Sequence, residues 1–474
     1  MFHKYTYQDF EDADDIKTFI KKAISAHKNS EAYQVALLAN DYDRQLNRTI
    51  RDYVRLVFSA EGRAIEDFTA SNNRIASNFF NRLNTQRVMY SLGNGISFIQ
   101  PDEAGQPDKV KEAMGGRDFD HQITESAYYA TIHGISFPFW NYNRVHCFKL
   151  TEFVPLFDEN DGTLRAGIRF WQLSKNKPMN ICLYEEDGYT SYVQKKRRAD
   201  LEELEPKKSY KVTYQKAPAD NEATIVGEEN YGSLPIVPMW TSRLKQSTLV
   251  GMMEQIDAYD LIKSGFANDM TDCAEIYWIV ENAGGMTDKD LARFRDRIKL
   301  MHIANADTTA GASVKPYTQE VPHAAREAIL TELRNSIYED YGALDVHAVA
   351  AGSTNDHIDA AYQPMDENAS DFEYWVGEAI KQILRLQGID DSPVFTRQRI
   401  SNQKEQVEIV SLEAQWLDQQ TILRKLPNIT DEEANAIIER NEDEDIARIG
   451  LDDGYKKRVL DGTDYLVTAE KDGA

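Results

Sequence analysis

Three side chains that could bind a metal ion lie in one predicted helix. Residues 117–137, RDFDHQITESAYYATIHGISF, contain His121, Glu125 and His133. His121 and Glu125 are one helical turn apart, but His133 lies two further turns along, and no additional ligand is evident. A zinc site needs three or four side chains that converge on one point. We therefore predict ordinary surface histidines here, with no bound metal and no cofactor.

Two other segments contain residue types that bind ions. Asp158–Gly162, DENDG, resembles the start of a calcium loop, but its fifth residue is Gly and no Glu follows at the twelfth position. A hairpin turn is therefore the preferred interpretation. Lys195–Arg198, KKRR, is the densest basic cluster. Four charges at the end of a strand are more often a solvated turn than a nucleic-acid patch, so we predict a turn there too.

The sequence lacks the short motifs of common catalytic and nucleotide-binding sites. We find no GxxxxGK[ST] loop, no GxGxxG after a strand, no GxSxG turn and no HExxH helix. The three cysteines, Cys147, Cys182 and Cys273, form no CxxC or Cys/His cluster, which is typical of a reducing cytoplasm. We predict that the protein is not an enzyme.

Length and charge narrow the class of protein further. At 474 residues the chain exceeds what one hydrophobic core usually organises, so two or more structural units are expected. The formal charge of −24 argues against tight nucleic-acid binding, but not against a conduit through which DNA passes without sticking. The first residues lack the order of a signal peptide and no apolar run is long enough for a membrane span, so no membrane contact is expected.

The elements that would position these residues are organised around one long predicted helix, Ser242–Asp272. Its apolar residues recur every three or four positions and form one stripe that needs to be covered. Pro238, just upstream, prevents an earlier start. The residues of the stripe are Leu249, Met252, Met253, Ile256, Tyr259, Ile262, Phe266 and Met270.

The rest of the pattern indicates an α+β protein. Residues 8–60 are predicted to be mostly helical, a second helix opens at 72–80 and continues to Leu92, and a third covers 117–137. Short strands are predicted from 139 to 227 and at 234–240. Beyond the long helix the predicted elements are a strand at 274–281, a helix at 286–298, a strand within 299–317, helices at 321–341 and 359–387, a strand at 395–400, and helices at 405–418 and 431–439.

One series of residues resembles a known protein family. The strand Leu234–Trp240, LPIVPMW, is followed by Ser247, Ile256–Asp260, Ser264 and Asn268–Asp269. This order is similar to the stem entry of the portal proteins of tailed double-stranded DNA phages, in particular the long-tailed siphovirus type. The helix at 242–272 would then be a stem helix.

A second series carries the same resemblance. Residues 72–95 read NNRI, NFF, Leu83, Gln86 and then Tyr90 before LGN, which looks like the family's N-terminal wing signature. Such a helix with a glycine stop is common by itself, so the value lies in both series occurring in the family's order. The resemblance covers roughly residues 40–440.

The resemblance implies a portal fold with a wing, stem, clip, tunnel loop and crown, assembled as a ring. The implied divisions are an N-terminal tail and wing at 1–240, a first stem helix at 241–272, a clip at 273–320, a second stem helix at 321–347, a tunnel loop at 348–358, a wing-closing helix and strand at 359–400, a crown at 401–440 and an acidic tail at 441–474.

The same resemblance implies which residues would line the DNA channel or contact partners. Channel-facing candidates on the stem are Asp257, Asp260 and Asp269, with a surface or intersubunit charge as the alternative for each. The implied tunnel loop contains Val349, Ala350, Ala351, Gly352, Ser353, Thr354, Asn355, Asp356 and His357. The implied clip contacts are Met286, Asp288, Lys289, Arg293, Arg297, Asp307 and Ala312.

A portal would form the ring at one capsid vertex through which DNA is packaged and later ejected. The family is twelvefold, so the dodecamer would carry a formal charge of about −288, and repulsion of phosphates would let DNA slide. Implied partners are the terminase large subunit, head-completion or adaptor proteins, the major capsid and scaffolding proteins, and double-stranded DNA in transit without sequence specificity. The implied location is the virion, and the host cytoplasm during assembly.

Two other classes stay open at this point. One is an acidic cytoplasmic metal-dependent hydrolase with its metal near His121. A stoichiometric metal in the purified protein would favour this class. The other is a helical scaffold or adaptor protein without a channel, which need not form closed rings.

Overall fold

The computed structural model describes most of the first 400 residues. The described ranges are 3–58, 62–67, 71–98, 109–196, 199–216, 223–273, 277–281, 313–317, 323–345 and 355–398, with a few single residues elsewhere. The chain divides into two units, one of residues 1–353 and 357–398 and one of residues 354–356 and 399–474. The elements below belong to the first unit, apart from the opening residues of α12.

The chain opens with four helices. They are α1 (Tyr7–Glu11), α2 (Ile16–Lys28), α3 (Glu31–Asp43) and α4 (Arg48–Arg51). Side chains of Thr6, Asp15 and Ser30 accept hydrogen bonds from the first turns of α1, α2 and α3, which satisfies amide groups that a helix start leaves free. The predicted helical region ends early, because β1 (Leu56–Phe58) pairs antiparallel with β2 (Ala64–Glu66).

An antiparallel sheet of five strands follows, in the spatial order β10-β9-β8-β7-β6. The prediction of short strands in this region is therefore correct. Asp158–Gly162 forms the predicted hairpin turn: the Asp158 amide donates to the Thr163 carbonyl oxygen at 2.8 Å, and Gly162 has a φ of +68°. The strands are β6 (Phe153–Phe157), β7 (Leu164–Trp171), β8 (Met179–Glu185), β9 (Gly188–Gln194) and β10 (Glu202–Lys208).

Pairs of strands complete the β structure of the described residues. Among the described residues, the predicted strand at 234–240 pairs through the isolated bridges Ser136↔Met239 and Phe139↔Ile236 rather than as a full strand. The antiparallel pairs are β4 (Ser136–Asn141) with β5 (Arg144–Lys149), β11 (Lys211–Lys216) with β12 (Ala223–Glu229), and β3 (Ile96–Phe98) with β15 (Pro393–Phe395).

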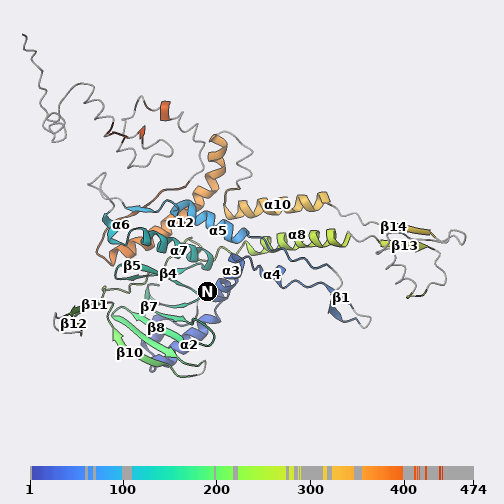
Figure 1. The fold of residues 1–474 in the computed structure, drawn as a ribbon. Helices are drawn as coiled ribbons and strands as arrows, with labels where there is room; N and C mark the ends of the chain where they lie inside the picture. Colours follow the sequence, from blue (N-terminus) through green and yellow to red (C-terminus); the bar gives the residue numbers. More distant parts are fainter. Residues whose placement is uncertain are drawn as a thin grey trace, which may run out of the picture. The chain divides into compact units, whose positions relative to one another are not determined.

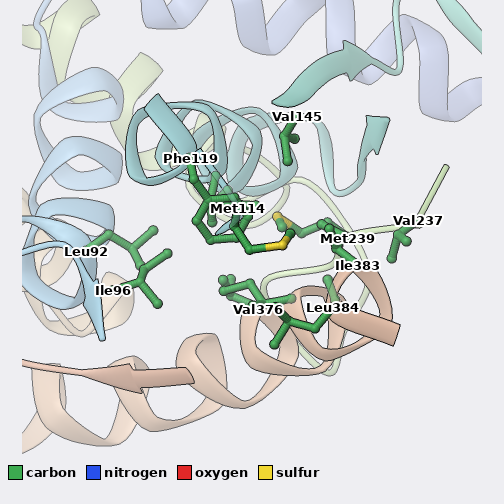
Figure 2. Packing of buried hydrophobic residues seen from close by; sticks show 14 of the residues in the cluster. Leu92, Ile96, Met114, Phe119, Val145, Val237, Met239, Val376, Ile383 and Leu384 are labelled. Atoms are coloured by element: carbon green, nitrogen blue, oxygen red, sulfur yellow. The ribbon is translucent and has the colours of Figure 1, made fainter. Parts of the chain in front are cut away.

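Helices α5 (Phe79–Leu92), α6 (Lys109–Ala113), α7 (Arg117–His133) and α12 (Asn355–Arg385) surround an apolar core. Figure 2 shows Met114 and Phe119 beside Met239, with Val376 and Ile383 of α12 across from them. The stripe predicted for 359–387 is buried here, because its apolar residues recur with the helical period. The helix predicted within 117–137, with its end at Gly134, has its last helical residue at His133, and Gly134 follows as the cap in the left-handed conformation at φ +87°.

Two long helices bracket a two-stranded sheet. Helix α8 (Met253–Cys273) leads into β13 (Tyr277–Glu281), which pairs antiparallel with β14 (Ser313–Tyr317), and α10 (His323–Tyr341) follows. Helices α8 and α10 lie side by side (Figure 1). The strand predicted at 274–281 and the helix predicted at 321–341 are thereby confirmed within the described residues.

The predicted start of the long helix at Ser242 is wrong. The helix begins at Met253, because the preceding residues turn: Lys245 has φ +52° and Gly251 has φ +96°. Side chains hold this turn against neighbouring elements. The Ser247 hydroxyl donates to the Ile132 carbonyl oxygen at 2.6 Å, and the Thr248 hydroxyl donates to Asn84 Oδ1 at 2.8 Å.

Several predicted elements lie outside the described residues. They are the helix at 286–298 apart from Thr287 and Lys289, the strand residues LMHIANA before 308, the greater part of the predicted crown helices at 405–418 and 431–439, and the acidic tail at 441–474. Among the helices that the structure describes, none combines the length and the apolar character that a bilayer crossing would require.

Candidate functional site: a polar seam along helix α8

The segment 71–78 runs along helix α8 instead of forming the predicted helix. Helix α5 begins only at Phe79, and the eight residues before it form neither helix nor strand. Three of their backbone amides donate to side chains of α8 that are spaced four residues apart. We call this set of contacts the polar seam.

The seam consists of three hydrogen bonds in register. The Ser77 amide donates to Asp260 Oδ1 at 2.9 Å and the Ile75 amide to the Ser264 hydroxyl at 3.0 Å. The Asn73 amide donates to Asn268 Oδ1 at 2.5 Å.

This regular spacing has a simple geometric cause. Eight residues of α-helix rise about 12 Å, which four residues of nearly extended chain can span. In an extended chain every second amide points to the same side, so one strip of backbone meets one row of helix side chains.

The α8 side chains of the seam are deeply buried. Asp260 is 0% exposed, Ser264 1% and Asn268 3%. Leaving a buried amide without an acceptor costs about 1–3 kcal/mol, so each of these side chains stabilises the position of segment 71–78. The same reasoning explains why polar residues, rather than apolar ones, occupy this buried face of the helix.

Asp260 is the centre of the seam. Its Oδ2 accepts a hydrogen bond from Asn47 Nδ2 at 2.5 Å, and Asn47 Nδ2 also donates to the Ser77 carbonyl oxygen at 3.1 Å. Burial raises the pKa of Asp260, while the hydrogen bonds from Asn47 and Ser77 oppose that shift. Because the carboxylate is fully covered within the chain, its predicted role as a channel-facing residue is incorrect.

Asp257, one turn earlier, is engaged by the N-terminal helices. The Tyr42 hydroxyl donates to Asp257 Oδ1 and the Thr49 hydroxyl donates to Oδ2, each at 2.6 Å. Burial and the neighbouring carboxylate both raise the pKa of Tyr42, so this hydroxyl remains a donor at neutral pH. Asp257 thus joins α8 to α3 and to the start of α4.

Asp269 faces the other long helix. Arg326 of α10 forms an ion pair with it, and the same guanidinium lies 5.8 Å from the ring centroid of Phe266. His323 contacts the Phe266 ring edge-on, at 5.5 Å between centroids. Nearer the start of α8, Gln255 donates to the Asp340 carboxylate. These contacts fix α10 against α8, and Asp269 remains a candidate for a channel-facing position.

The start of α8 is held by an apolar cluster instead. Leu249, Met252 and Ile256 pack with Ile337 and Tyr338 of α10, and each is at most 6% exposed. The predicted stripe is buried most deeply at this end of the helix, whereas Tyr259, Ile262 and Phe266 further along are half-buried. Met270, its last member, is 47% exposed in the isolated chain.

The remaining predicted site residues are placed only in part. Asn355, Asp356 and His357 begin α12, so the predicted loop is shorter at this end, whereas Val349, Ala350, Ala351, Gly352, Ser353 and Thr354 lie outside the described residues. Of the predicted clip contacts, Lys289 is exposed, and Met286, Asp288, Arg293, Arg297, Asp307 and Ala312 lie outside the described residues.

The side chains first considered as metal ligands have other environments. His133 is buried, with Nε2 2.9 Å from Asn40 Oδ1, and burial lowers its pKa to about 3. Glu125 lies 4.0 Å from the Lys149 ammonium, and His121 is exposed. No cluster of three or more potential metal ligands occurs among the described residues. Lys195 follows β9 and pairs with Glu202 at 2.6 Å.

Some residues that bind the aspartates of α8 were not identified from the sequence. Tyr42, Asn47 and Thr49 belong to a region whose only signal was helical periodicity, yet they bind the two aspartates of α8. The two series that carry the family resemblance were treated as separate signatures. In the structure they contact each other through the seam.

The comparisons with known proteins identify the family. A model described as "Phage portal protein, SPP1 Gp6-like" matches residues 21–447, and the chain belongs to that family. Portal proteins are structural components of the phage head-tail connector and of the virion capsid, not enzymes.

Two relatives support the assignment. The chain is 21% identical to the portal protein of Bacillus phage SPP1 over 448 residues, which are 88% of this chain and 84% of that protein. It is 27% identical to the portal protein of Clostridium phage phiCD119 over 218 residues, which are 44% of this chain and 48% of that protein. The match therefore spans about half the length of the phiCD119 protein.

A solved structure also matches. It is an HK97-family phage portal protein from Corynebacterium diphtheriae, with 14% sequence identity and a TM-score of 0.26. The match covers 78% of this chain and 94% of that one.

Proposed function

We propose that the chain forms a closed ring at one capsid vertex, through which double-stranded DNA enters during packaging and leaves during infection. The observation that carries the proposal is the seam. It joins the segment Asn73–Ser77, which leads into α5, to helix α8 through buried hydrogen bonds that fix the two against each other. A helix that must wall a channel around moving DNA needs such a rigid base.

The parts of a portal are assigned on this basis. We assign α8 and α10 as the stem and β13 with β14 to the clip. The reason is their order in the sequence, in which α8 precedes the two strands and α10 follows them. The wing comprises the N-terminal helices, the five-stranded sheet and the core around α12. Residues 346–354, between α10 and α12, would contain the tunnel loop, residues 401–440 the crown, and residues 441–474 the acidic tail.

Charge supports passage rather than retention of DNA. The formal charge of −24 per chain multiplies in a ring, and an acidic wall repels phosphates at short range. Asp269 is the stem aspartate that we retain as a channel-facing candidate, since its side chain is 36% exposed in the isolated chain. Basic residues at the channel-facing positions of an assembled ring would contradict this sliding argument.

The partners follow from this assignment. The ring would contain twelve copies, as expected from the family, and would be built into the shell with the major capsid and scaffolding proteins. The clip would dock the terminase large subunit during packaging and the head-completion or adaptor proteins afterwards. Lys289 is the exposed clip residue that we select for a test.

A packaging assay tests the proposal. Procapsids containing the chain, terminase, ATP and linear duplex DNA should yield DNA protected from nuclease, and procapsids without the chain should yield none. Lys289→Glu should weaken terminase or adaptor binding but leave assembly intact. Lys196→Glu, which changes an exposed lysine after β9, is the matched control and should leave both unchanged. Equal packaging with and without the chain would contradict the proposed function.

A further inference from the structure

Arg87 of α5 is a buried cation that no carboxylate neutralises within the described residues. The residue is 9% exposed, and its Nη2 donates to the Thr241 carbonyl oxygen at 2.9 Å. Its guanidinium carbon lies 5.7 Å from the ring centroid of Phe372. Its Nε has no hydrogen-bond partner among the described residues.

Such an arrangement is unusual for an arginine. Buried charges are normally paired, because removing a charge from water without a counter-charge is costly. The chain has 78 acidic residues against 54 basic ones, yet no described carboxylate lies within 4.0 Å of this guanidinium. The guanidinium therefore has unused hydrogen-bonding capacity for an anionic partner.

A hollow of about 340 Å³ lies beside Arg87. It is roughly ten times the volume of about 30 Å³ that one water molecule occupies in the liquid. A side chain at Gly251 would meet no atom within 4 Å, so the wall is open at this position. The hollow is lined by Arg87, Ser242, Leu244, Gln246, Ser247, Thr248, Val250, Gly251, Met252, Asp340, Tyr341 and Asn368.

The polar groups around the guanidinium form a fixed network. The Tyr341 hydroxyl donates to Asn84 Oδ1 at 2.7 Å, and the Thr248 hydroxyl donates to the same oxygen at 2.8 Å. Burial raises the pKa of Tyr341 to about 12, and the nearby positive charge of Arg87 opposes that shift. These two hydroxyl groups already donate to Asn84, and as neutral groups they do not balance the charge of Arg87.

One acidic residue lines the same hollow. Asp340 is exposed, lies beyond ion-pair distance of Arg87 and accepts a hydrogen bond from Gln255. Its negative charge would weaken the binding of an anion in the hollow. Removing that charge by Asp340→Asn should therefore strengthen anion binding.

We propose that this hollow binds a small oxyanion of the phosphate class from solution, with Arg87 as its principal ligand. A guanidinium is suited to this role because its planar set of N–H groups matches two oxygens of one oxyanion. Asn368 Nδ2 donates to the Tyr341 carbonyl oxygen at 2.9 Å, and within the described residues its second N–H is a further donor. The anion would link α5 and α12 to the starting turn of α8 and the end of α10.

Binding of inorganic phosphate to the full-length chain tests the proposal directly. Calorimetry and thermal unfolding are carried out at constant pH and ionic strength, with chloride replaced by phosphate. Saturable binding and a rise in Tm are expected for the wild type. Arg87→Met should weaken binding at least tenfold. Arg385→Met, which removes an exposed arginine from the last turn of α12, is the matched control and should bind as the wild type does.

Two further variants keep the test decisive if Arg87→Met does not fold. Val250→Glu places a carboxylate in the wall of the hollow from a position that is 49% exposed, so it should remove the phosphate response without lowering Tm. Asp340→Asn should tighten phosphate binding. Equal phosphate binding by Val250→Glu and the wild type would overturn the proposal. An absence of saturable phosphate binding to the wild type would overturn it as well. If Arg87→Met also impaired ring formation in that case, the counter-charge of Arg87 would be a carboxylate of a neighbouring copy.

Discussion

The two ends of helix α8 are buried by opposite means. At its start, Ile256 and the residues before it pack against apolar side chains of α10. Further along, Asp260, Ser264 and Asn268 occupy the buried face and bind backbone amides of segment 71–78. The first kind of contact tolerates other apolar residues of similar size. The second kind requires a hydrogen-bond acceptor at a particular position along the helix. It therefore fixes the register in which segment 71–78 packs against α8.

The two kinds of contact should therefore contribute differently to global stability and to the position of segment 71–78 along α8. Apolar burial supplies most of the free energy of folding, because it scales with the area removed from water. A buried hydrogen bond contributes about 1 kcal/mol net but is costly when one partner is lost. The apolar end of α8 should therefore control global stability, and the seam should control the local position of segment 71–78.

Truncation at the apolar end should have the largest effect. Ile256→Ala should lower the free energy of unfolding by about 2–5 kcal/mol, because Ile256 is 0% exposed and the change leaves a cavity. Denaturant unfolding of the purified chain measures this change. Met270→Ala, on the same helix at a residue 47% exposed, is the control and should change little. Equal effects of the two changes would contradict the assignment of the apolar end.

The seam should respond locally. Asp260→Asn replaces one carboxylate oxygen by a donor, so it leaves either the Ser77 amide or the Asn47 side chain without an acceptor. We expect a loss of about 1–3 kcal/mol. Hydrogen exchange should accelerate at the amides of Asn73, Ile75 and Ser77, and remain unchanged in the core around α12. Glu254→Gln, an exposed change on α8, should leave all these amides protected.

Lowering the pH should change the contributions of the buried histidines and of Asp260 to the free energy of unfolding in opposite directions. Burial lowers the pKa of His133 to about 3 and that of His27 to about 4, both below the usual 6.5. The unfolded chain then binds more protons, so their contribution to stability is present above pH 6.5 and is lost as the pH falls toward these folded values. Each should cost about 0.7 kcal/mol between pH 7 and pH 6.

Asp260 behaves in the other direction. Its pKa is raised in the folded chain, so folding favours its protonated form, and between the unfolded and folded pKa its contribution to stability falls as the pH rises. Unfolding curves from pH 7 to pH 5 test the balance. His133→Gln should reduce the loss of stability over this range, and an unchanged pH profile would show that His133 is not neutral in the folded chain.

The ion pair between the stem helices should matter least. Asp269→Asn should lower stability by only about 0.5 kcal/mol, because both side chains of the Asp269–Arg326 pair are partly exposed and solvent screens them. Salt should remove even this difference. A loss above 2 kcal/mol would place Asp269 among the buried contacts of the seam.

The contrast between the two ends also explains what could be predicted from the sequence. The apolar faces of α7, α10 and α12 were predicted because their residues recur with the helical period. The helix starts at 72–80 and at Ser242 were predicted wrongly. Segment 71–78 forms its hydrogen bonds with α8 rather than within itself, and the turn before α8 depends on Gly251 and Lys245 at positive φ.

The polar seam could not be derived from periodicity. Asp260, Ser264 and Asn268 are polar, so a hydrophobic pattern places them on the solvent side of the helix. Only their partners, which are amides almost two hundred residues away in the chain, make their burial favourable. The resemblance to portal proteins identified both segments as significant, but it gave no indication that they contact each other.

The central claim is that the chain forms a portal ring, and images of the purified protein test it most directly. Electron micrographs of the full-length chain, alone and with its capsid and scaffolding partners, should show closed rings with an open centre wide enough for duplex DNA. Native mass measurements of the same sample should give a single high-order oligomer. A sample that contains only monomers under each of these conditions would contradict the claim.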